Sequence, residues 1–270
     1  MKIYHYTSIQ TLALILRNKK IRFNRLDKVD DMEESIYGSG PNLTKLGIYA
    51  FVSCWTKSEK ENPALWKMYT DYKGVRIGLD AMPFKTYKVK DGFTSFFQEE
   101  MNFGSDYFIL SFCNEAKLHD VIYVDNPEEE IKNIIKSKNG DMLASIYDLG
   151  LYKRKEWAMQ QESRFKIIAL PADCNGAIEL SNHSASQYNV VMGNIFNSII
   201  VNIAKNKPIT PLNFDMDLDP VKLSDIEITM GPMTTEDDRI IVENLLNPYH
   251  NAKIYNSKLL IREKSDNMEN

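Results

Sequence analysis

The sequence predicts an α+β fold, in which strands and helices follow one another without the regular alternation of a doubly wound sheet. Short segments of strand composition are scattered among amphipathic helical segments along the chain, and no internal repeat or low-complexity tract interrupts them. The 270 residues, of which 43% are hydrophobic and 26% charged, can bury a substantial core. We expect one domain over residues 1–262, with room for insertions in mid-chain and near the C-terminus. A charged tail over 263–270 follows it.

The N-terminal third gives the clearest local signals. Thr7 or Ser8 is a suitable N-cap for a helix whose apolar residues lie between positions 9 and 16. Residues 48–55 are almost uncharged, which is typical of a strand buried on both faces. The other elements expected here are strands at 3–6, 21–23 and 75–79, an acidic turn at 30–34, a glycine-punctuated loop at 38–41 and a helix at 63–72.

The rest of the chain has less regular patterns, and some of its segments are left without a single assignment. Residues 81–108 mix aromatic and charged side chains and give no assignment, and residues 189–204 fit one helix or two strands. Thr234 or Thr235 is expected to cap a late helix. The expected elements are helices at 128–135, 141–156 and 236–246, strands at 164–170, 223–230 and 253–262, and a proline-containing loop at 206–220.

Composition excludes several classes of function. The net charge of -4 gives no basic field for non-specific nucleic-acid binding, although a local patch could bind. The scattered cysteines Cys54, Cys113 and Cys174 fit neither a disulfide framework nor a structural zinc site. We therefore expect no structural metal. No segment resembles a signal peptide or a membrane span, which predicts a cytoplasmic protein without a membrane partner.

Two polar residues stand out as candidates for chemistry. His5 follows Tyr4 and precedes Tyr6 and Thr7 at the start of the chain, where its ring could hold a ligand hydroxyl or be satisfied by neighbouring groups. Glu162 precedes a strand-like run, and alternation would place Gln160, Glu162 and Arg164 on one face. The carboxylate could stabilise a developing positive charge, or it could form a surface ion pair with Arg164.

Other features favour structural roles. The stripe Trp66, Tyr69 and Tyr72 has helical spacing and is more typical of a core than of a ring-stacking platform. The basic run 153–155 could meet a pyrophosphate and the acidic run 30–34 a cation, although both are typical of solvated surfaces. The phosphate-loop, Rossmann, zinc-hydrolase and nucleophile-elbow motifs are missing from the sequence.

The opening Tyr4-His5-Tyr6-Thr7-Ser8 resembles that of a bacterial family known as domain-of-unknown-function family 2971. Further pieces follow in the family's order: Asp31 to Glu34, Ser53-Cys54-Trp55, Leu65-Trp66-x-x-Tyr69, Gly74-Val75-x-Ile77-Gly78, Lys155-x-Trp157 with Glu162-x-Arg164, and Ile226-x-Ile228 with Gly231-Pro232. One departure concerns the segment after Trp157. The family carries Glu-x-Glu-x-Arg there, whereas this chain has Gln160 in place of the first glutamate.

The opening histidine strand and the late Gln-x-Glu strand are also similar to the ADP-ribosyltransferase superfamily. That resemblance implies a mixed, split β-sheet core flanked by helices, with NAD as the substrate. It implies that His5, with Tyr6 and Thr7, holds NAD and that Ser53 or Tyr69 lines the nicotinamide pocket. Glu162 would then be catalytic, and Gln160 would orient a protein or nucleic-acid acceptor.

Three functions follow as expectations from this resemblance. The first is an NAD-dependent ADP-ribosyltransferase-like enzyme, as in toxins or phage-defence effectors. The second is a catalytically silent NAD- or nucleotide-binding sensor or interaction module. The third is an NAD glycohydrolase, in which water replaces the acceptor. On any of them, we expect the strands of His5 and Glu162 to be neighbours in one mixed sheet and both side chains to face a common cleft.

Overall fold

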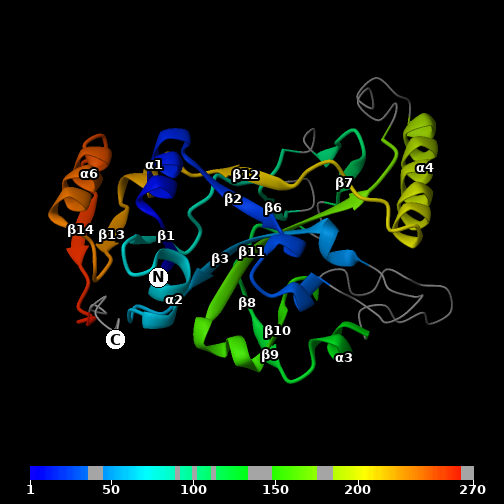
Figure 1. The fold of residues 1–270 in the computed structure, drawn as a ribbon. Coiled ribbons are helices and arrows are strands. Elements are labelled where there is room, and N and C mark those ends of the chain that lie inside the picture. The colour runs from blue at the N-terminus through cyan, green and yellow to red at the C-terminus, as the bar shows by residue number, and fades with distance from the viewer. Residues whose placement is uncertain are drawn as a thin grey trace.

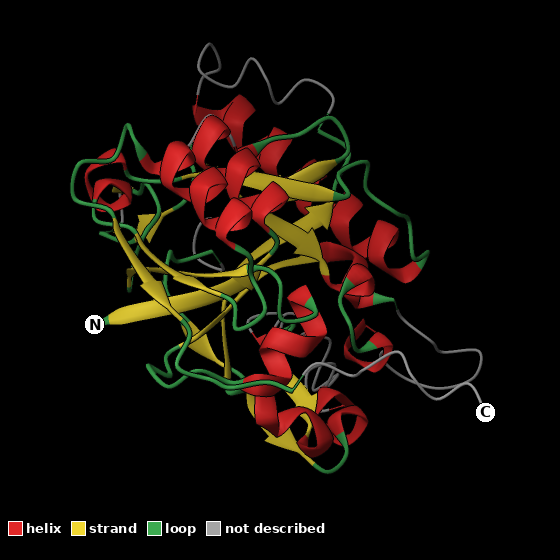
Figure 2. Cartoon of the chain, turned by 60° about the vertical axis from the view of Figure 1, so that its left-hand side comes forward, coloured by secondary structure: helices red, strands yellow, loops and turns green. Residues whose placement is uncertain are grey.

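In the described part of the chain, a mixed sheet of ten strands forms the centre of the molecule and confirms the α+β class (Figure 1). The computed structural model describes residues 1–35, 45–88, 92–98, 102–110, 114–132, 148–174 and 185–262. The main path of the sheet runs β12-β2-β3-β1-β4-β13-β14, and β11 joins β3, β7 and β8 beside this path. Most neighbours are antiparallel, whereas β13 and β14 are parallel. Helices lie on either side of the strands (Figure 2).

The first elements follow the predicted pattern. Strand β1 (Lys2–Thr7) leads into helix α1 (Ile9–Asn18), and the Ser8 side chain accepts a hydrogen bond from the main-chain N–H of Thr11. The helix ends at Lys19, whose φ of 53° is left-handed, and strand β2 (Lys20–Arg25) returns. The short 3-10 helices η1 (Leu26–Lys28), η2 (Met32–Ser35) and η4 (Leu46–Tyr49) then lead to β3.

Strand β3 (Ala50–Thr56) is where the sheet divides. One edge pairs with β11 (Glu162–Pro171) along its whole length, from Glu162 opposite Thr56 to Ile168 opposite Ala50. The other edge pairs with β2 at residues 51 and 52 and with β1 at Thr56. Within the described chain, residues 53–55 have no strand partner on that second edge. Because α1 joins the diverging strands β1 and β2, an opening is left between them.

The core includes side chains on both faces of β11. Every residue of β11 is buried, and the rings of Phe23, Phe84, Phe96 and Phe165 pack edge to face with centroids 4.9–6.1 Å apart. Helix α2 (Pro63–Thr70) covers β1 through Trp66, and strand β4 (Val75–Asp80) pairs with β1. The other elements in this part are β5 (Tyr87–Lys88), β6 (Thr94–Ser95), β7 (Tyr107–Ile109), β8 (His119–Asp120), β9 (Ile122–Val124) and α3 (Pro127–Lys132).

The second half corrects several expectations. The helix predicted over 141–156 is wrong in its described part, because β10 (Tyr152–Arg154) pairs in parallel with β9 and η8 (Lys155–Gln160) follows. Residues 189–204 belong to one helix, α4 (Ala185–Ala204), at the flank of the molecule (Figure 1). The predicted loop 206–220 contains β12 (Asn213–Asp217), which pairs with β2. The expected strand 223–230 divides into α5 (Pro220–Ser224) and β13 (Glu227–Met230).

The C-terminal elements close the far edge of the sheet. Helix α6 (Glu236–Leu246) begins with the expected cap at Thr235 and packs beside α1. Strand β14 (Lys253–Asn256) is shorter than the strand predicted over 253–262. The loop 38–41, the end of the helix predicted over 128–135 and the tail 263–270 lie outside the described residues.

Candidate active site

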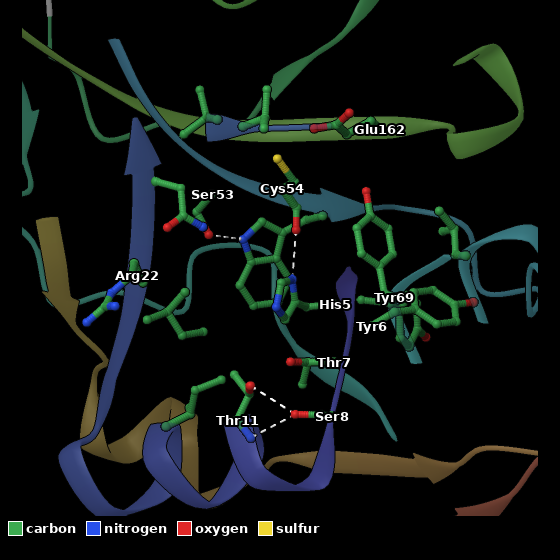
Figure 3. Close-up of a pocket in the computed structure, with 18 of the residues that line it drawn as sticks. His5, Tyr6, Thr7, Ser8, Thr11, Arg22, Ser53, Cys54, Tyr69 and Glu162 are labelled. Carbon is green, nitrogen blue, oxygen red and sulfur yellow. Dashed lines mark hydrogen bonds between the residues drawn. The ribbon is translucent and has the colours of Figure 1, made fainter. Parts of the chain in front are cut away.

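A cavity of about 650 Å³ fills the opening between β1 and β2 (Figure 3). This volume is in the range of small-molecule sites. Its walls come from β1, one side of α1, the outward face of β2, and the open edge of β3. Leu65 and Tyr69 of α2, the loop 28–30, and residues 160 and 162 complete it. The opening therefore follows from the division of the sheet at β3.

All seven residues singled out from the sequence line this cavity. They are His5, Tyr6, Thr7, Ser53, Tyr69, Gln160 and Glu162. One part of the expectation is wrong, because the strands of His5 and Glu162 are not neighbours. Strand β3 lies between β1 and β11 and pairs with both. The two side chains thus face the cavity across the width of β3 (Figure 3).

The ring of His5 is fixed across the opening. Its Nδ1 lies 2.9 Å from the main-chain oxygen of Cys54, and its ring packs against Trp55 with centroids 5.3 Å apart. A carbonyl oxygen only accepts, so Nδ1 carries a proton and donates. Burial lowers the pKa of His5, which favours the neutral ring, and Nε2 is then an acceptor. A ligand hydroxyl would therefore donate to this ring.

Tyr6 and Thr7 contribute the buried part of the β1 wall. The hydroxyl of Tyr6 accepts a hydrogen bond from the main-chain N–H of Asn62 at 3.0 Å, and its ring packs edge to face on Trp66. Asn62 also caps α2 through its side-chain oxygen. Tyr6 therefore fixes the position of α2 against the cavity. Thr7 is buried beside Ser8 at the start of α1.

Ser53 and Tyr69 occupy different walls. The hydroxyl of Ser53 is buried and accepts a hydrogen bond from the indole N–H of Trp55 at 3.0 Å. Tyr69 is 40% exposed and donates to the carboxylate of Asp30 at 2.7 Å. Burial of the hydroxyl, with nearby negative charge including Asp30, raises the pKa of Tyr69, so the phenol keeps its proton. The aromatic stripe of α2 is thus divided, because Trp66 belongs to the core and Tyr69 to the cavity wall.

Gln160 reaches the cavity from a turn and not from a strand. It ends η8, and Gln161 takes a left-handed φ of 47° before β11 begins at Glu162. The strand alternation expected for positions 160, 162 and 164 therefore fails at Gln160. Its side-chain N–H₂ donates to the Tyr69 hydroxyl at 3.3 Å. The amide oxygen of Gln160 is buried without a hydrogen-bond partner in the described structure.

Glu162 belongs to a buried cluster of two carboxylates and two cations, here called the ionic quartet: Glu34, Lys153, Glu162 and Arg164. Arg164 makes five hydrogen bonds. It donates to Glu162 at 2.5 and 3.0 Å, to Glu34 through both Nη atoms, and to the main-chain oxygen of Gly150 at 2.7 Å. All five N–H groups of the guanidinium are thereby used.

Lys153 bridges the same two carboxylates. Its Nζ lies 3.0 Å from Glu34 and 3.2 Å from Glu162, and 4.9 Å from the centre of the Trp157 ring. The four formal charges cancel, which offsets the large cost of removing them from water. The ion pair between Glu162 and Arg164 that the sequence suggested does exist, but it is buried and not on the surface.

The quartet keeps Glu162 ionised at the cavity wall. Burial by itself raises the pKa of the Glu162 carboxyl, but Arg164 and Lys153 outweigh it and lower this pKa to about 2. Cys54, opposite Arg164 in the strand register, points toward Glu162 (Figure 3). Burial, followed by the charge of Glu162, raises the pKa of the Cys54 thiol well above its ordinary value. A protonated thiol thus stands beside an ionised carboxylate.

Sequence reasoning missed Glu34, Lys153 and Asp30 as partners of the site. Glu34 and Asp30 lie in the acidic run 30–34, and Lys153 opens the basic run 153–155. Arg154 and Lys155 pair with Glu33 and Asp125, outside the cavity. The opposite charges of the two runs were the only available signal, because the contacts that join them span more than a hundred residues.

Arg22 lies on the opposite wall of the cavity from Glu162 (Figure 3). Arg22 of β2 donates through Nε and Nη2 to Asp215 of β12 at 2.8 and 3.0 Å, and Asp215 also lines the cavity. Lys20 of β2 and Lys28, two residues before Asp30, line the cavity as well. The cavity therefore has carboxylates at Glu162 and Asp30, and along β2 it has the cations Lys20 and Arg22 beside the carboxylate of Asp215. Among the described residues, no cluster of three or more histidine, cysteine or acidic side chains is arranged to hold a metal ion.

Comparison of the sequence and the structure with known proteins identifies no relative. No family model, curated protein or solved structure matches the chain. The resemblances drawn from its motifs thus stay predictions. Within the described part of the chain, no helix has both the length and the apolar character needed to cross a membrane.

Proposed function

We propose that the protein binds NAD in the cavity between β1 and β2 and cleaves the bond between nicotinamide and ribose. The observation that carries this proposal is that His5 and the ionised carboxylate of Glu162 face one cavity across β3. A sheet divided around such a cavity fits an ADP-ribosyltransferase-like fold. The resemblance to family 2971 concerns the same residues.

Glu162 has the chemistry that this cleavage needs. When the C1′–N bond breaks, its electron pair leaves with nicotinamide and positive charge develops on the ribose. An ionised carboxylate at the wall would accept a hydrogen bond from a ribose hydroxyl and stabilise that charge. His5 would accept from a second ribose hydroxyl through Nε2. Ser53 or Tyr69 would border the nicotinamide, and Arg22 with Lys20 would attract the diphosphate.

The product depends on which nucleophile attacks the ribose. A protein side chain or nucleic-acid base would give an ADP-ribosylated product, as expected for a toxin or phage-defence effector, and water would give free ADP-ribose. Gln160 borders the cavity beside Glu162 and is the residue we assign to the acceptor. Its neutral amide lacks the negative charge that would attract a cationic acceptor such as arginine.

A second function is favoured by one specific observation. Both carboxylate oxygens of Glu162 already accept hydrogen bonds from cations, and the side chain is only 6% exposed. A carboxylate so occupied could serve the fold alone. The protein would then be a silent NAD-binding sensor or interaction module.

Release of nicotinamide from NAD by the purified protein distinguishes these functions. We expect release by the wild-type protein and a loss on the order of 10²–10³ in rate for Glu162→Gln. Glu156→Gln is the matched control, because Glu156 is an exposed carboxylate of η8 that does not line the cavity. Binding of NAD by calorimetry without release would support the silent module. Full turnover by a folded Glu162→Gln protein would make the carboxylate structural and exclude Glu162 from the cleavage step.

A further inference from the structure

The charges around Glu162 pose a problem for the cleavage of NAD. Two cations, Arg164 and Lys153, contact this carboxylate directly. Glu162 and these two cations alone would carry a net charge of one positive unit. Such a wall would repel the positive charge of the nicotinamide ring and of the developing oxocarbenium ion. These two cations need a second carboxylate beside them for Glu162 to present a negative charge.

Glu34 supplies that charge from the rear of the cluster. Its carboxylate contacts the same two cations, with Lys153 Nζ at 3.0 Å and Arg164 Nη2 at 3.1 Å. Glu34 is 1% exposed and is absent from the described lining of the cavity, whereas Glu162 is part of it. The cations therefore lie between two carboxylates, and the carboxylate nearest the cavity is negative. In a buried site the nearest charge dominates the potential.

We propose that Glu34 is a positioning residue of the NAD site, which neutralises the second cation so that Glu162 presents negative potential to the nicotinamide end. This inference rests on the proposed function. Glu34 touches no substrate and acts through Arg164 and Lys153. The same network orients Glu162, because the guanidinium binds both carboxylates at once.

The charge of the nicotinamide ring offers a direct test. Carbocyclic NAD keeps the cationic ring but cannot form an oxocarbenium ion, and NADH has a neutral ring. The ratio of their dissociation constants, carbocyclic NAD over NADH, reports the potential at the nicotinamide end. We expect Glu34→Gln to raise this ratio about threefold to tenfold and Lys153→Gln to lower it by a similar factor. Merely structural damage would not move the two variants in opposite directions.

A double variant completes the test. Glu34→Gln with Lys153→Gln removes one charge of each sign, so we expect the ratio to return close to the wild-type value. Glu33→Gln is the control, because Glu33 is the exposed neighbour that pairs with Arg154. Should Glu34→Gln alone fail to fold, the double variant compared with Lys153→Gln gives the same measurement. Nicotinamide release by Glu34→Gln should also fall, on the order of tenfold.

The outcomes separate this inference from the proposed function. An unchanged ratio in folded Glu34→Gln would overturn the role of Glu34 and leave NAD cleavage intact. Binding of the dinucleotides without nicotinamide release by the wild-type protein would exclude the enzyme, while the ratio would still decide the role of Glu34. If the wild-type protein binds neither dinucleotide, both the proposed function and the proposed role of Glu34 are wrong.

Discussion

His5 and Cys54 join two strands at the place where the sheet divides: Nδ1 of His5 donates to the main-chain oxygen of Cys54 at 2.9 Å. Residues 53–55 lack a strand partner on this edge in the described structure, so the side chain of His5 satisfies a carbonyl that a neighbouring strand would otherwise bind. This hydrogen bond ties β1 to β3 at the border of the cavity, and it also fixes which ring nitrogen of His5 carries the proton. The same imidazole thus has a structural role in the sheet and, in the proposed function, binds the ligand.

Replacing His5 by alanine should weaken NAD binding and slow nicotinamide release. The loss of one hydrogen bond to the ligand corresponds to about 0.5–1.5 kcal/mol, or roughly threefold to tenfold in the dissociation constant. Calorimetry with NAD measures the first effect. His250→Ala is the control, because His250 is exposed and does not line the cavity. Unchanged affinity in folded His5→Ala would confine His5 to a structural role.

Acid should destabilise the protein through the ionic quartet. The pKa of Glu162 is about 2 in the folded protein and near its ordinary 4.5 in the unfolded chain. The unfolded state therefore binds the proton first as the pH falls. The stabilisation is complete above pH 4.5 and is lost as the pH falls toward 2. Glu162→Gln should lack this part of the pH dependence and should be less stable at pH 7 by about 3–5 kcal/mol, since it leaves buried cations uncompensated.

Urea unfolding of both proteins between pH 3 and 7 measures this difference. His119, whose pKa is lowered to about 4 by burial and by Lys166 and Lys117, acts in the same direction between pH 6.5 and 4. It is present in both proteins, so its contribution cancels in the comparison. Parallel pH curves for wild type and Glu162→Gln would show that the quartet does not hold Glu162 ionised.

Local signals in the sequence predicted the elements that depend on local chemistry. Ser8 and Thr235 cap the helices that they were expected to cap. The helix over 141–156 failed for the opposite reason. Residues 152–154 pair in parallel with β9, and Lys153 is buried by carboxylates far away in the chain. A pattern of neighbouring residues carries no information about either contact.

The candidate site was predictable in part. His5 and Glu162 stood out in the sequence, and the resemblance to the ADP-ribosyltransferase superfamily implied the other residues; the structure brings them to one cavity. The order of the strands was not predicted correctly, because β3 lies between β1 and β11. Glu34 and Lys153 were read as surface charges, since a charged run is usually solvated. Only the tertiary fold turns them inward, where each charge requires an opposite partner.

Gln160→Ala should impair transfer to an acceptor while sparing nicotinamide release. Gln160 donates to the hydroxyl of Tyr69, which is part-exposed at the cavity wall. In the proposed function, nicotinamide release depends on Glu162 and not on Gln160. The release rate of Gln160→Ala should therefore stay within about threefold of the wild-type rate, a smaller change than the loss of one strong hydrogen bond would cause. Partition between ADP-ribosylated acceptor and free ADP-ribose is the measurement. Tyr69→Phe is the matched variant, because it removes the hydroxyl that Gln160 binds and keeps the ring. An equal loss of release in Gln160→Ala would place Gln160 in the cleavage step.

Asn62 should control both the stability of α2 and the shape of the cavity. Its side-chain oxygen accepts from the N–H groups of Ala64 and Leu65, and its N–H₂ donates to the main-chain oxygen of Met159 at 2.5 Å. Its main-chain N–H donates to Tyr6. Asn62→Ala should cost about 1 kcal/mol of unfolding free energy through the lost cap. It should also weaken NAD binding, because the bond to Met159 holds the start of α2, and α2 supplies Leu65 and Tyr69 to the cavity wall.

Asn62→Asp separates the two effects. Aspartate caps a helix as well as asparagine does, so thermal unfolding should stay close to that of the wild-type protein. It cannot donate to Met159, and its carboxylate would face that carbonyl oxygen. We therefore expect the affinity for NAD, measured by calorimetry, to fall in Asn62→Asp as it does in Asn62→Ala. Wild-type affinity in Asn62→Asp would mean that the bond to Met159 does not position the wall of the cavity, and that Asn62 acts through the helix cap alone.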